Sequence, residues 1–384
     1  MKNNDNYLSN HSRREFLKIV GIAGAGVGLF GISGCLNPGK AIRLYGTGTL
    51  DIGKKWDQLY KDTGIKLLFQ DNGNDTGPVI ANMINGTASY DFDLGGLQGG
   101  CERELALAGK ILPWDVSKIP NWAQTWQWVK DIPHCKVDGK QFGLPVVVNA
   151  DSILYRPDKI GGKVDSYEVI FDPKYKGRTS MEDAWINSAV FAAIYLKGNG
   201  IANIDNPGDL TESELGIVME FLIKKKRDGQ FRTFWKGWEE GVRLIKSGEV
   251  YAMTGWEPIV YAAKSSGVNV EYAVPREGYE GWSNDLVIHI GAEKRGLLEE
   301  VHEFANWELK GYYGCELAKQ RGYIVPNSLS VDYAKTDKEY NPIDQENKLN
   351  HVRDKFLKSK VYWQNTRPVN YKLYEDWWSK LRNS

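Results

Sequence analysis

The chain has 384 residues, and its 49 lysines and arginines are balanced by 49 aspartates and glutamates. This balance leaves no strongly basic face of the kind that nucleic-acid-binding proteins use, so we expect no nucleic-acid partner. The length is sufficient for two domains of medium size, each with its own apolar core.

The first element in chain order is an export signal. Arg13 and Arg14 precede an uncharged segment, 19–34, which is rich in glycine and alanine. A basic region, an apolar region and an exit of small residues are the parts of a secretory signal, and the paired arginines indicate the twin-arginine variant. The alternative is a transmembrane anchor, but this segment is shorter than the roughly 20 residues that a bilayer requires.

The segment Ile32-Ser33-Gly34-Cys35 resembles the lipobox of bacterial lipoproteins. The resemblance implies a signal peptide over residues 1–34, cleavage before Cys35 and attachment of lipid to the Cys35 thiol. The exported protein would then be tethered to a membrane surface, in a periplasm or at the cell exterior. We expect no further membrane-spanning segment after Cys35.

The remaining cysteines are Cys101, Cys135 and Cys315, so at least one thiol is unpaired in a monomer. Their spacing does not resemble that of a metal site, and we predict none. Buried single thiols are the favoured interpretation, with a disulfide between Cys101 and Cys135 as the alternative in an oxidising compartment.

Alternating strands and helices follow the signal. Residues 41–45 form a short apolar run, apolar residues then recur at helical spacing up to Thr63-Gly64, and residues 65–69 form a second run. This order predicts a strand, a helix and a strand in a parallel sheet of an α/β protein. The later predicted segments are a helix that begins near Asp75 or Thr76, a strand at 90–94, a helix at 102–108, extended chain at 142–148 and 153–155, helices at 184–197, 211–226 and 236–247, and strands at 250–254 and 270–274.

Two tryptophans mark candidate ligand contacts. Trp256 and Trp282 each follow a glycine at the predicted exit of a strand, where the ligand sites of α/β proteins gather. Packing in the core or on the surface is the alternative role for either residue.

Several segments, in this order, are similar to one protein family. They are Asp172 to Gly177 with Ser180 to Asp183, Gly248 to Val250 leading to Trp256, Val274 to Gly278 leading to Trp282, Gly322 to Asn327, and Trp363 to Asn365 before a helix that contains Tyr374. Over residues 41–384 the chain resembles the extracellular solute-binding proteins of ABC importers. Within that family it is most similar to the spermidine/putrescine-binding branch.

The resemblance implies a two-lobed periplasmic-binding fold that closes on its ligand by hinge motion and delivers it to a membrane permease with its ATPase. The first lobe would comprise residues 35–149 and 284–328, and the second residues 150–283 and 329–384. We expect a monomer without a cofactor. A ligand sensor that signals through another partner is an alternative role, because it would use the same closure.

The resemblance also implies ligand contacts. The positions that match the polyamine branch are Asp183, Trp256, Trp282, Tyr323 and Gln364. The positions that depart from it are Thr47, Leu50, Gly96 and Gln98 in the first lobe, where the branch has aromatic residues and a serine, and Ile186 and Asn284, where it has acids. Asp285 follows Asn284 directly and is a candidate replacement.

Two missing carboxylates would leave an ammonium group of a polyamine unpaired. The sequence therefore favours a ligand with one positive charge, such as a monoamine, a quaternary amine or an amino-acid-like zwitterion. A zwitterion would place its cation near Asp183, Trp256 and Trp282, and its carboxylate at the backbone N–H groups of residues 95–100. The alternative role of Asp183 is to cap the helix that follows it.

Other ligand classes remain alternatives, namely thiamine-like heterocycles, phosphonates and ferric iron. Iron binders present adjacent tyrosines, and Tyr312-Tyr313 is such a pair, although packing is the favoured role for it.

An enzyme is the rival class of protein. The one G-x-G-x-x-G match, residues 26–31, falls inside the signal segment. The chain has no C-x-x-C, H-E-x-x-H or G-x-S-x-G motif. Its histidines are scattered and are expected to be surface or core residues; they are His11, His134, His289, His302 and His351. We therefore predict that the protein is not an enzyme.

Overall fold

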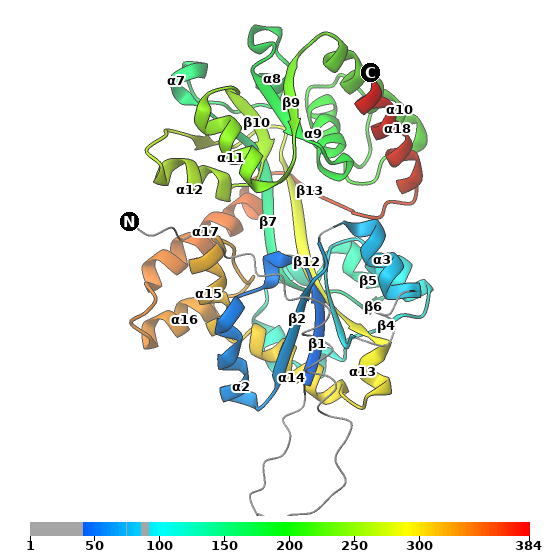
Figure 1. Cartoon of the computed structure of the whole chain (residues 1–384), viewed down its shortest axis with the longest axis vertical. Coiled ribbons are helices and arrows are strands. Elements are labelled where there is room, and N and C mark those ends of the chain that lie inside the picture. The colour runs from blue at the N-terminus through cyan, green and yellow to red at the C-terminus, as the bar shows by residue number, and fades with distance from the viewer. Residues whose placement is uncertain (1–40, 74, 86–91) are drawn as a thin grey trace, which may run out of the picture. The chain divides into compact units, whose positions relative to one another are not determined.

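The computed structural model describes residues 41–73, 75–85 and 92–384 (Figure 1). The predicted signal peptide and Cys35 lie outside the described residues. Among the helices of the described ranges, none combines the length and the apolar character needed to cross a bilayer.

The first sheet is built on three parallel strands, β1 (Ala41–Gly46), β2 (Lys66–Asp71) and β3 (Leu94–Gln98), with β1 in the middle. The helix α2 (Asp57–Thr63) connects β1 to β2 and ends at Gly64, whose φ of 74° is readily adopted by glycine. This unit confirms the predicted strand, helix and strand. The helices α3 (Thr76–Asn85) and α5 (Glu102–Leu107) follow β2 and β3.

Two long antiparallel strands, β7 (Leu144–Tyr155) and β12 (Tyr279–His289), run side by side through the middle of the fold (Figure 1). β12 also pairs with β3 and so belongs to the first sheet. Residues 144–151 of β7 pair with β12, whereas residues 152–155 pair with β10 (Ala252–Gly255). β7 is buried along its whole length, as expected for a strand shared by two sheets.

The second sheet continues from the end of β7 through β10, β8 (Thr179–Glu182) and β9 (Phe231–Trp235). The helix α9 (Trp185–Gly198) is buried along most of its length. The other helices of this region are α10 (Glu212–Arg227), α11 (Gly237–Ser247) and α12 (Pro258–Ser265). They enclose an apolar core that is separate from the core of the first sheet.

The C-terminal third of the chain is shared between the two sheets. The helices α13 (Ile290–Lys294), α14 (Leu298–Glu308) and α15 (Tyr312–Arg321) follow β12. α16 (Leu329–Thr336) and α17 (Pro342–Lys358) pack against α15, whereas the terminal helix α18 (Tyr371–Asn383) packs against α10 (Figure 1). Of the predicted second-lobe segment 329–384, α18 is buried in the second core and Tyr362 packs against it, whereas residues of α16 and α17 belong to smaller clusters.

The shorter elements complete the description. They are β4 (Ile111–Leu112), β5 (Lys136–Val137), β6 (Lys140–Gln141), β11 (Glu271–Tyr272), β13 (Val361–Trp363), α6 (Gln127–Lys130), α7 (Pro157–Ile160) and α8 (Glu168–Phe171). Cys101, Cys135 and Cys315 are all buried free thiols, which confirms the favoured interpretation of the cysteines.

Candidate ligand site

Three carboxyl groups gather where β7 and β12 run side by side. Asp151 of β7 and Glu280 of β12 are directly opposite each other in the antiparallel pair, and both are buried. Glu182, the last residue of β8, is close enough for its charge to act on Glu280. We call Asp151, Glu182 and Glu280 the acidic cluster.

Burial and mutual repulsion hold protons on these acids. Desolvation, together with the neighbouring charge of Glu257, raises the pKa of Asp151 to about 7, although Lys355 opposes this. Desolvation and the charge of Asp151 raise the pKa of Glu182 to about 8, and the same two causes raise that of Glu280. A positive charge placed among the three groups would offset both the desolvation of the carboxylates and their mutual repulsion.

A chain of amide side chains connects the acids. Asn187 of α9 donates from Nδ2 to Oε2 of Glu182 over 2.8 Å. Gln364 donates from Nε2 to Oδ1 of Asn187 over 2.8 Å and to Oε1 of Glu280 over 3.3 Å. The other oxygen of Glu280 is buried and has no hydrogen-bond partner among the described residues. Gln364, a predicted ligand residue, is therefore part of the same site.

Aromatic rings lie beside the acids. The indole Nε1 of Trp282 donates to Oδ2 of Asp151 over 2.8 Å, and its ring meets the ring of Tyr323 edge to face at 5.2 Å. Trp256 follows β10 and packs edge to face on Trp235 at 5.0 Å. All three predicted aromatic residues are half-buried. Trp282 and Tyr323 lie near Asp151, and carboxylates beside aromatic rings are suited to bind organic ammonium groups.

Near the first sheet, two uncharged amide side chains are candidate ligand contacts. Asn284 of β12 is paired with Gln98 of β3. Oδ1 of Asn284 and Oε1 of Gln98 are both buried, and neither has a hydrogen-bond partner within the part of the chain that the structure describes. These two oxygens can accept hydrogen bonds from a donor-rich ligand.

The two neighbouring predicted positions serve local structure. The Thr47 hydroxyl accepts a hydrogen bond from the Thr49 amide at the end of β1. Gly96 is packed so closely that a Cβ there would lie 2.5 Å from Leu50 Cδ1. A side chain at position 96 would require the neighbouring strand end to move.

The structure places Asp183 in a different environment from Glu182. Its carboxylate accepts hydrogen bonds from Trp378 and Arg382 and pairs with Lys236. Burial favours the neutral acid, but these partners outweigh it and lower the pKa of Asp183. Within the described residues no side chain caps α9, so the predicted capping role of Asp183 is not what the structure shows. Asp285 is buried beside His134, Cys135 and Glu102.

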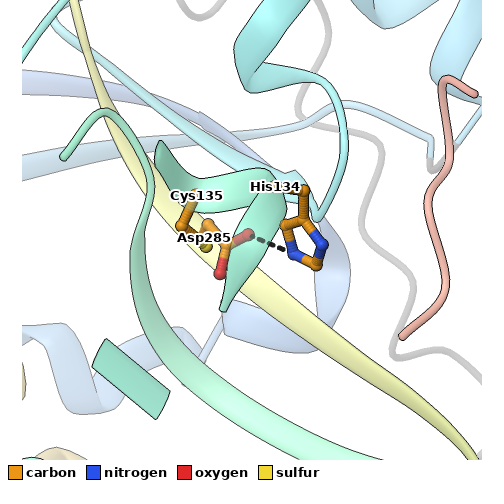
Figure 2. A group of neighbouring side chains, drawn as sticks. All are labelled: His134, Cys135 and Asp285. Carbon is orange, nitrogen blue, oxygen red and sulfur yellow. Dashed lines mark ion pairs between the residues drawn. The ribbon is translucent and has the colours of Figure 1, made fainter. Parts of the chain in front are cut away.

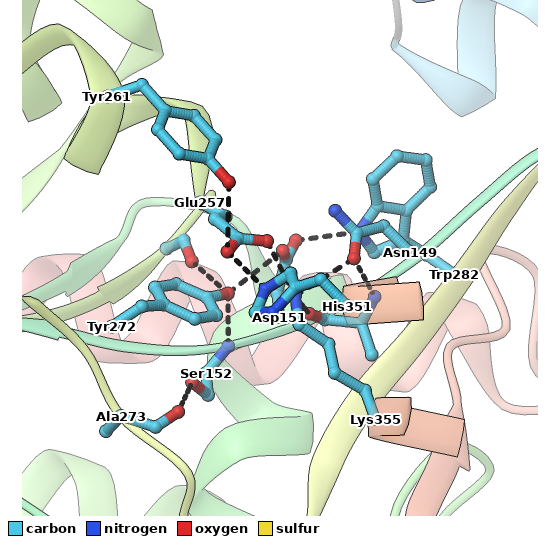
Figure 3. Close-up of polar contacts among 12 residues, drawn as sticks. Asn149, Asp151, Ser152, Glu257, Tyr261, Tyr272, Ala273, Trp282, His351 and Lys355 are labelled. Atoms are coloured by element: carbon cyan, nitrogen blue, oxygen red, sulfur yellow. Dashed lines mark hydrogen bonds and ion pairs between the residues drawn. The ribbon is translucent and has the colours of Figure 1, made fainter. Parts of the chain in front are cut away.

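A buried lysine lies on the flank of Asp151 that also holds Glu257 and Tyr272 (Figure 3). Lys355 of α17 donates from Nζ to Oε2 of Glu257 over 2.7 Å, to Oδ1 of Asn149 over 3.0 Å and to the carbonyl of Ala150 over 3.0 Å. Burial opposes ionisation of Glu257, but Lys355 and His351 outweigh it and lower its pKa to about 2. Because Glu257 precedes α12 and Lys355 lies on α17, this pair connects a helix of the second sheet to a helix that packs on α15.

A tyrosine completes this flank. The hydroxyl of Tyr272 donates to Oδ1 of Asp151 over 3.1 Å and accepts from the backbone amide of Ser152 over 2.7 Å (Figure 3). Together with Trp282 it fixes the orientation of the Asp151 carboxyl.

Sequence reasoning missed the acidic cluster. Asp151 is a single acid within a long apolar run, which is a signal for a functional buried charge. Glu182 precedes the acid that the family pattern selected, and Glu280 lies two residues before Trp282. Successive side chains of a strand point to opposite faces, so the structure is needed to tell which acid faces the site.

Comparison with known proteins identifies the family. The model of the bacterial extracellular solute-binding proteins matches residues 57–341, well over half of the chain. The chain belongs to this family. Its members of the periplasmic type bind small solutes for ABC transporters, so the predicted class of function is confirmed. The family also places the protein outside the cytoplasm, in a periplasm or the extracellular space.

Individual relatives agree with this assignment. The chain is 24% identical over 286 residues to the putrescine/cadaverine-binding protein of Pseudomonas aeruginosa, covering 70% of this chain and 75% of that protein. It is 23% identical over 301 residues to the putrescine-binding periplasmic protein PotF of Escherichia coli, covering 73% and 76%. A solved spermidine/putrescine ABC transporter protein of Listeria monocytogenes is similar with a TM-score of 0.69 and 19% identity, covering 89% of this chain and 99% of that chain. The predicted two-lobed fold is therefore confirmed.

Lys355→Met tests the buried ion pair. The substitution leaves the Glu257 carboxylate buried without its lysine, so we expect the free energy of unfolding to fall by about 3 to 5 kcal/mol. Urea unfolding measures this loss. Lys358→Met is the matched control on the same helix, because Lys358 pairs with Asp354 at the surface. Equal losses in the two variants would contradict the account.

The acidic cluster predicts the pH dependence of stability without ligand. Aspartate and glutamate in the unfolded chain titrate near pH 4, whereas Asp151 and Glu182 keep their protons to about pH 7 and 8. The folded state thus binds more protons than the unfolded state between about pH 4 and 8, and these groups make stability fall as pH rises. Urea unfolding at pH 5 and pH 8 should show a smaller decline for Asp151→Asn than for the parent. A larger decline in the variant would contradict the assignment.

Proposed function

We propose that the solute is a linear organic diamine, held by the acidic cluster and by the rings of Trp282, Tyr323 and Trp256. The observation that carries the proposal is the gathering of three carboxyl groups on strands β7, β8 and β12. Lys355 is a positively charged residue near Asp151, but its ammonium group already donates hydrogen bonds to three acceptors, Glu257 among them. Two ammonium groups compensate this cluster better than one.

The groups on the first-sheet side support a ligand with hydrogen-bond donors at both ends. The unpartnered oxygens of Asn284 and Gln98 are acceptors. The glycine-rich segment offers little to a carboxylate, since the Gly99 amide donates to the Ser283 carbonyl and the Gly100 amide to Glu102. These contacts favour a diamine over the zwitterion that the sequence suggested.

The acidic cluster also bears on the positions where this chain departs from the polyamine-binding branch. Acids are absent at Ile186 and Asn284, and this led us to expect a ligand with one charge. Asp151, Glu182 and Glu280 supply carboxyl groups in their place. The named relatives that bind putrescine and cadaverine support the same class of ligand.

The alternative of ferric iron has little support in the candidate tyrosines. The hydroxyl of Tyr313 donates to the Leu50 carbonyl in the core of the first sheet, and that of Tyr312 donates to the Lys55 carbonyl. Both contacts fit the packing role that we favoured for this pair.

The two lobes would close around the diamine, with α12 and α17 already joined by the pair of Glu257 and Lys355, and the closed form would be delivered to a permease and its ATPase. We further propose that the protein leaves the cell by the twin-arginine route and is lipidated at Cys35. Mass spectrometry of the membrane-bound protein should find an acylated Cys35 at its N-terminus. An unmodified N-terminus there would contradict the lipid proposal and leave the ligand proposal untouched.

Glu182→Gln and its neighbour Asp183→Asn test the ligand site as a pair. Isothermal titration calorimetry with putrescine, cadaverine, choline and 4-aminobutyrate should find the diamines tightest. Glu182→Gln should weaken diamine binding by about tenfold or more, because a charge-assisted hydrogen bond contributes roughly 1.5 to 3 kcal/mol.

Asp183→Asn should keep the parent affinity, since the Asp183 carboxylate is occupied by Arg382, Trp378 and Lys236. Loss of affinity in Asp183→Asn with none in Glu182→Gln would restore the contact that the family pattern suggested. Tighter binding of choline or 4-aminobutyrate than of either diamine would overturn the proposal.

A further inference from the structure

A second group of side chains able to bind a ligand lies around Asp285 (Figure 2). His134 and Cys135 come from the short turn that precedes β5, and Asp285 comes from β12. One donor atom from each of the three residues lies within 4.8 Å of the others. Glu102, at the start of α5, approaches the same Asp285 carboxyl. We call these four residues the His134 cluster.

The two acids of this cluster are buried together. Glu102 and Asp285 are both fully buried. One Glu102 oxygen accepts a hydrogen bond from the Gly100 amide over 2.8 Å, and one Asp285 oxygen accepts from the Ser283 hydroxyl over 3.0 Å. Oε1 of Glu102 and Oδ1 of Asp285 have no partner from outside the cluster in the described ranges; within it, Glu102 and Cys135 contact the Asp285 carboxyl. Two buried carboxyl groups in this arrangement require either a shared proton or a cation.

The histidine and the cysteine complete a set of metal donors. Nε2 of His134 lies 3.6 Å from Oδ2 of Asp285 and 3.0 Å from the Ser283 hydroxyl. The Cys135 thiol is fully buried. A metal ion is the partner that would make a thiolate stable there.

The backbone approaches these donors closely at two glycines. A Cβ on Gly99 would lie 2.2 Å from His134 Nε2 and 2.7 Å from the Ser283 hydroxyl. A Cβ on Gly143 would lie 2.7 Å from Oε1 of Glu102. Glycine at both positions keeps side chains away from the donor atoms on two sides of the His134 cluster.

We propose that His134, Cys135 and Asp285 bind a zinc-type divalent cation, and that Glu102, which contacts Asp285, moves in as the fourth donor. One sulfur, one imidazole nitrogen and two carboxylate oxygens are donors that zinc accepts in tetrahedral geometry. Zinc-to-donor distances of about 2.0 to 2.3 Å imply donor separations of about 3.3 to 3.8 Å. The separation between His134 and Asp285 already falls in this range; the widest separation among these three donors must shorten by about 1 Å, and Glu102 must approach from farther away.

The ion would have a structural role. Four protein donors leave no open position for a substrate, so the site is closed rather than catalytic. The register of β12 against β7 shifts between Asn284 and Asp285. A metal ion at Asp285 would fasten this irregular part of β12 to α5 and to the turn at His134, one residue from the Asn284 amide at the ligand site.

Cobalt provides the direct test, because a cobalt-bound thiolate absorbs strongly in the near ultraviolet. The purified protein, freed of metal with a chelator, should bind one equivalent of Co²⁺ with this absorption, and one equivalent of Zn²⁺ should abolish it. Zinc at about 100 times its Kd should raise the unfolding temperature by about 3 °C or more. No thiolate absorption and no thermal shift would overturn the proposal, leaving Glu102 and Asp285 as a pair that shares a proton.

Two cysteine variants make the assignment specific. Cys135→Ser should lose the thiolate absorption and weaken zinc binding by at least tenfold. Cys315→Ser is the matched control, because Cys315 is another buried free thiol whose Sγ contacts the Ser330 carbonyl in a separate cluster. Retention of the absorption in Cys135→Ser, or its loss in Cys315→Ser, would overturn the assignment. Should Cys135→Ser fail to fold, Asp285→Asn must still weaken zinc binding, and unchanged zinc affinity in it would equally overturn the proposal.

Discussion

The rest of the structure depends on the burial of two carboxyl groups side by side where β7 pairs with β12. Antiparallel pairing sets Asp151 opposite Glu280, and side chains in such positions are roughly 5 Å apart at Cβ. Two acids there are unfavourable for folding unless they are protonated or compensated. The surroundings compensate only in part: Trp282 and Tyr272 donate to Asp151, and Gln364 donates to Glu280. The remaining cost is what a cationic ligand would remove, which connects the sheet register to the proposed function.

The same strands connect the two lobes. β7 pairs with β12 in its first part and with β10 in its last part, so Asp151 and Glu280 lie on the strands that cross between the lobes, whereas Glu182 lies on the second sheet. The ion pair of Lys355 with Glu257 adds a second connection, between α17 and α12. A ligand bound at this place contacts residues whose positions depend on both lobes. Capture of the solute and the relative position of the lobes are therefore expected to be coupled.

Local sequence patterns predicted the local features of this fold. The alternation of strands and helices and the extended chain that became β7 were expected from spacing. Glu182 was not selected beside Asp183, because the sequence does not show which face of the four-residue strand β8 points toward Asp151 and Glu280. The His134 cluster was invisible for a related reason. Its donors come from three distant segments, and only the pairing of β12 with β3 and β7 brings Asp285 to that place.

The most direct measurement counts the protons released when putrescine binds. Calorimetric titration near pH 7.5 in two buffers of different ionisation enthalpy gives this number. The account predicts net proton release, because an ammonium group placed among Asp151, Glu182 and Glu280 lowers the pKa of acids that hold protons at this pH without ligand. Binding of putrescine without any release of protons would contradict the claim that the acidic cluster receives the ligand.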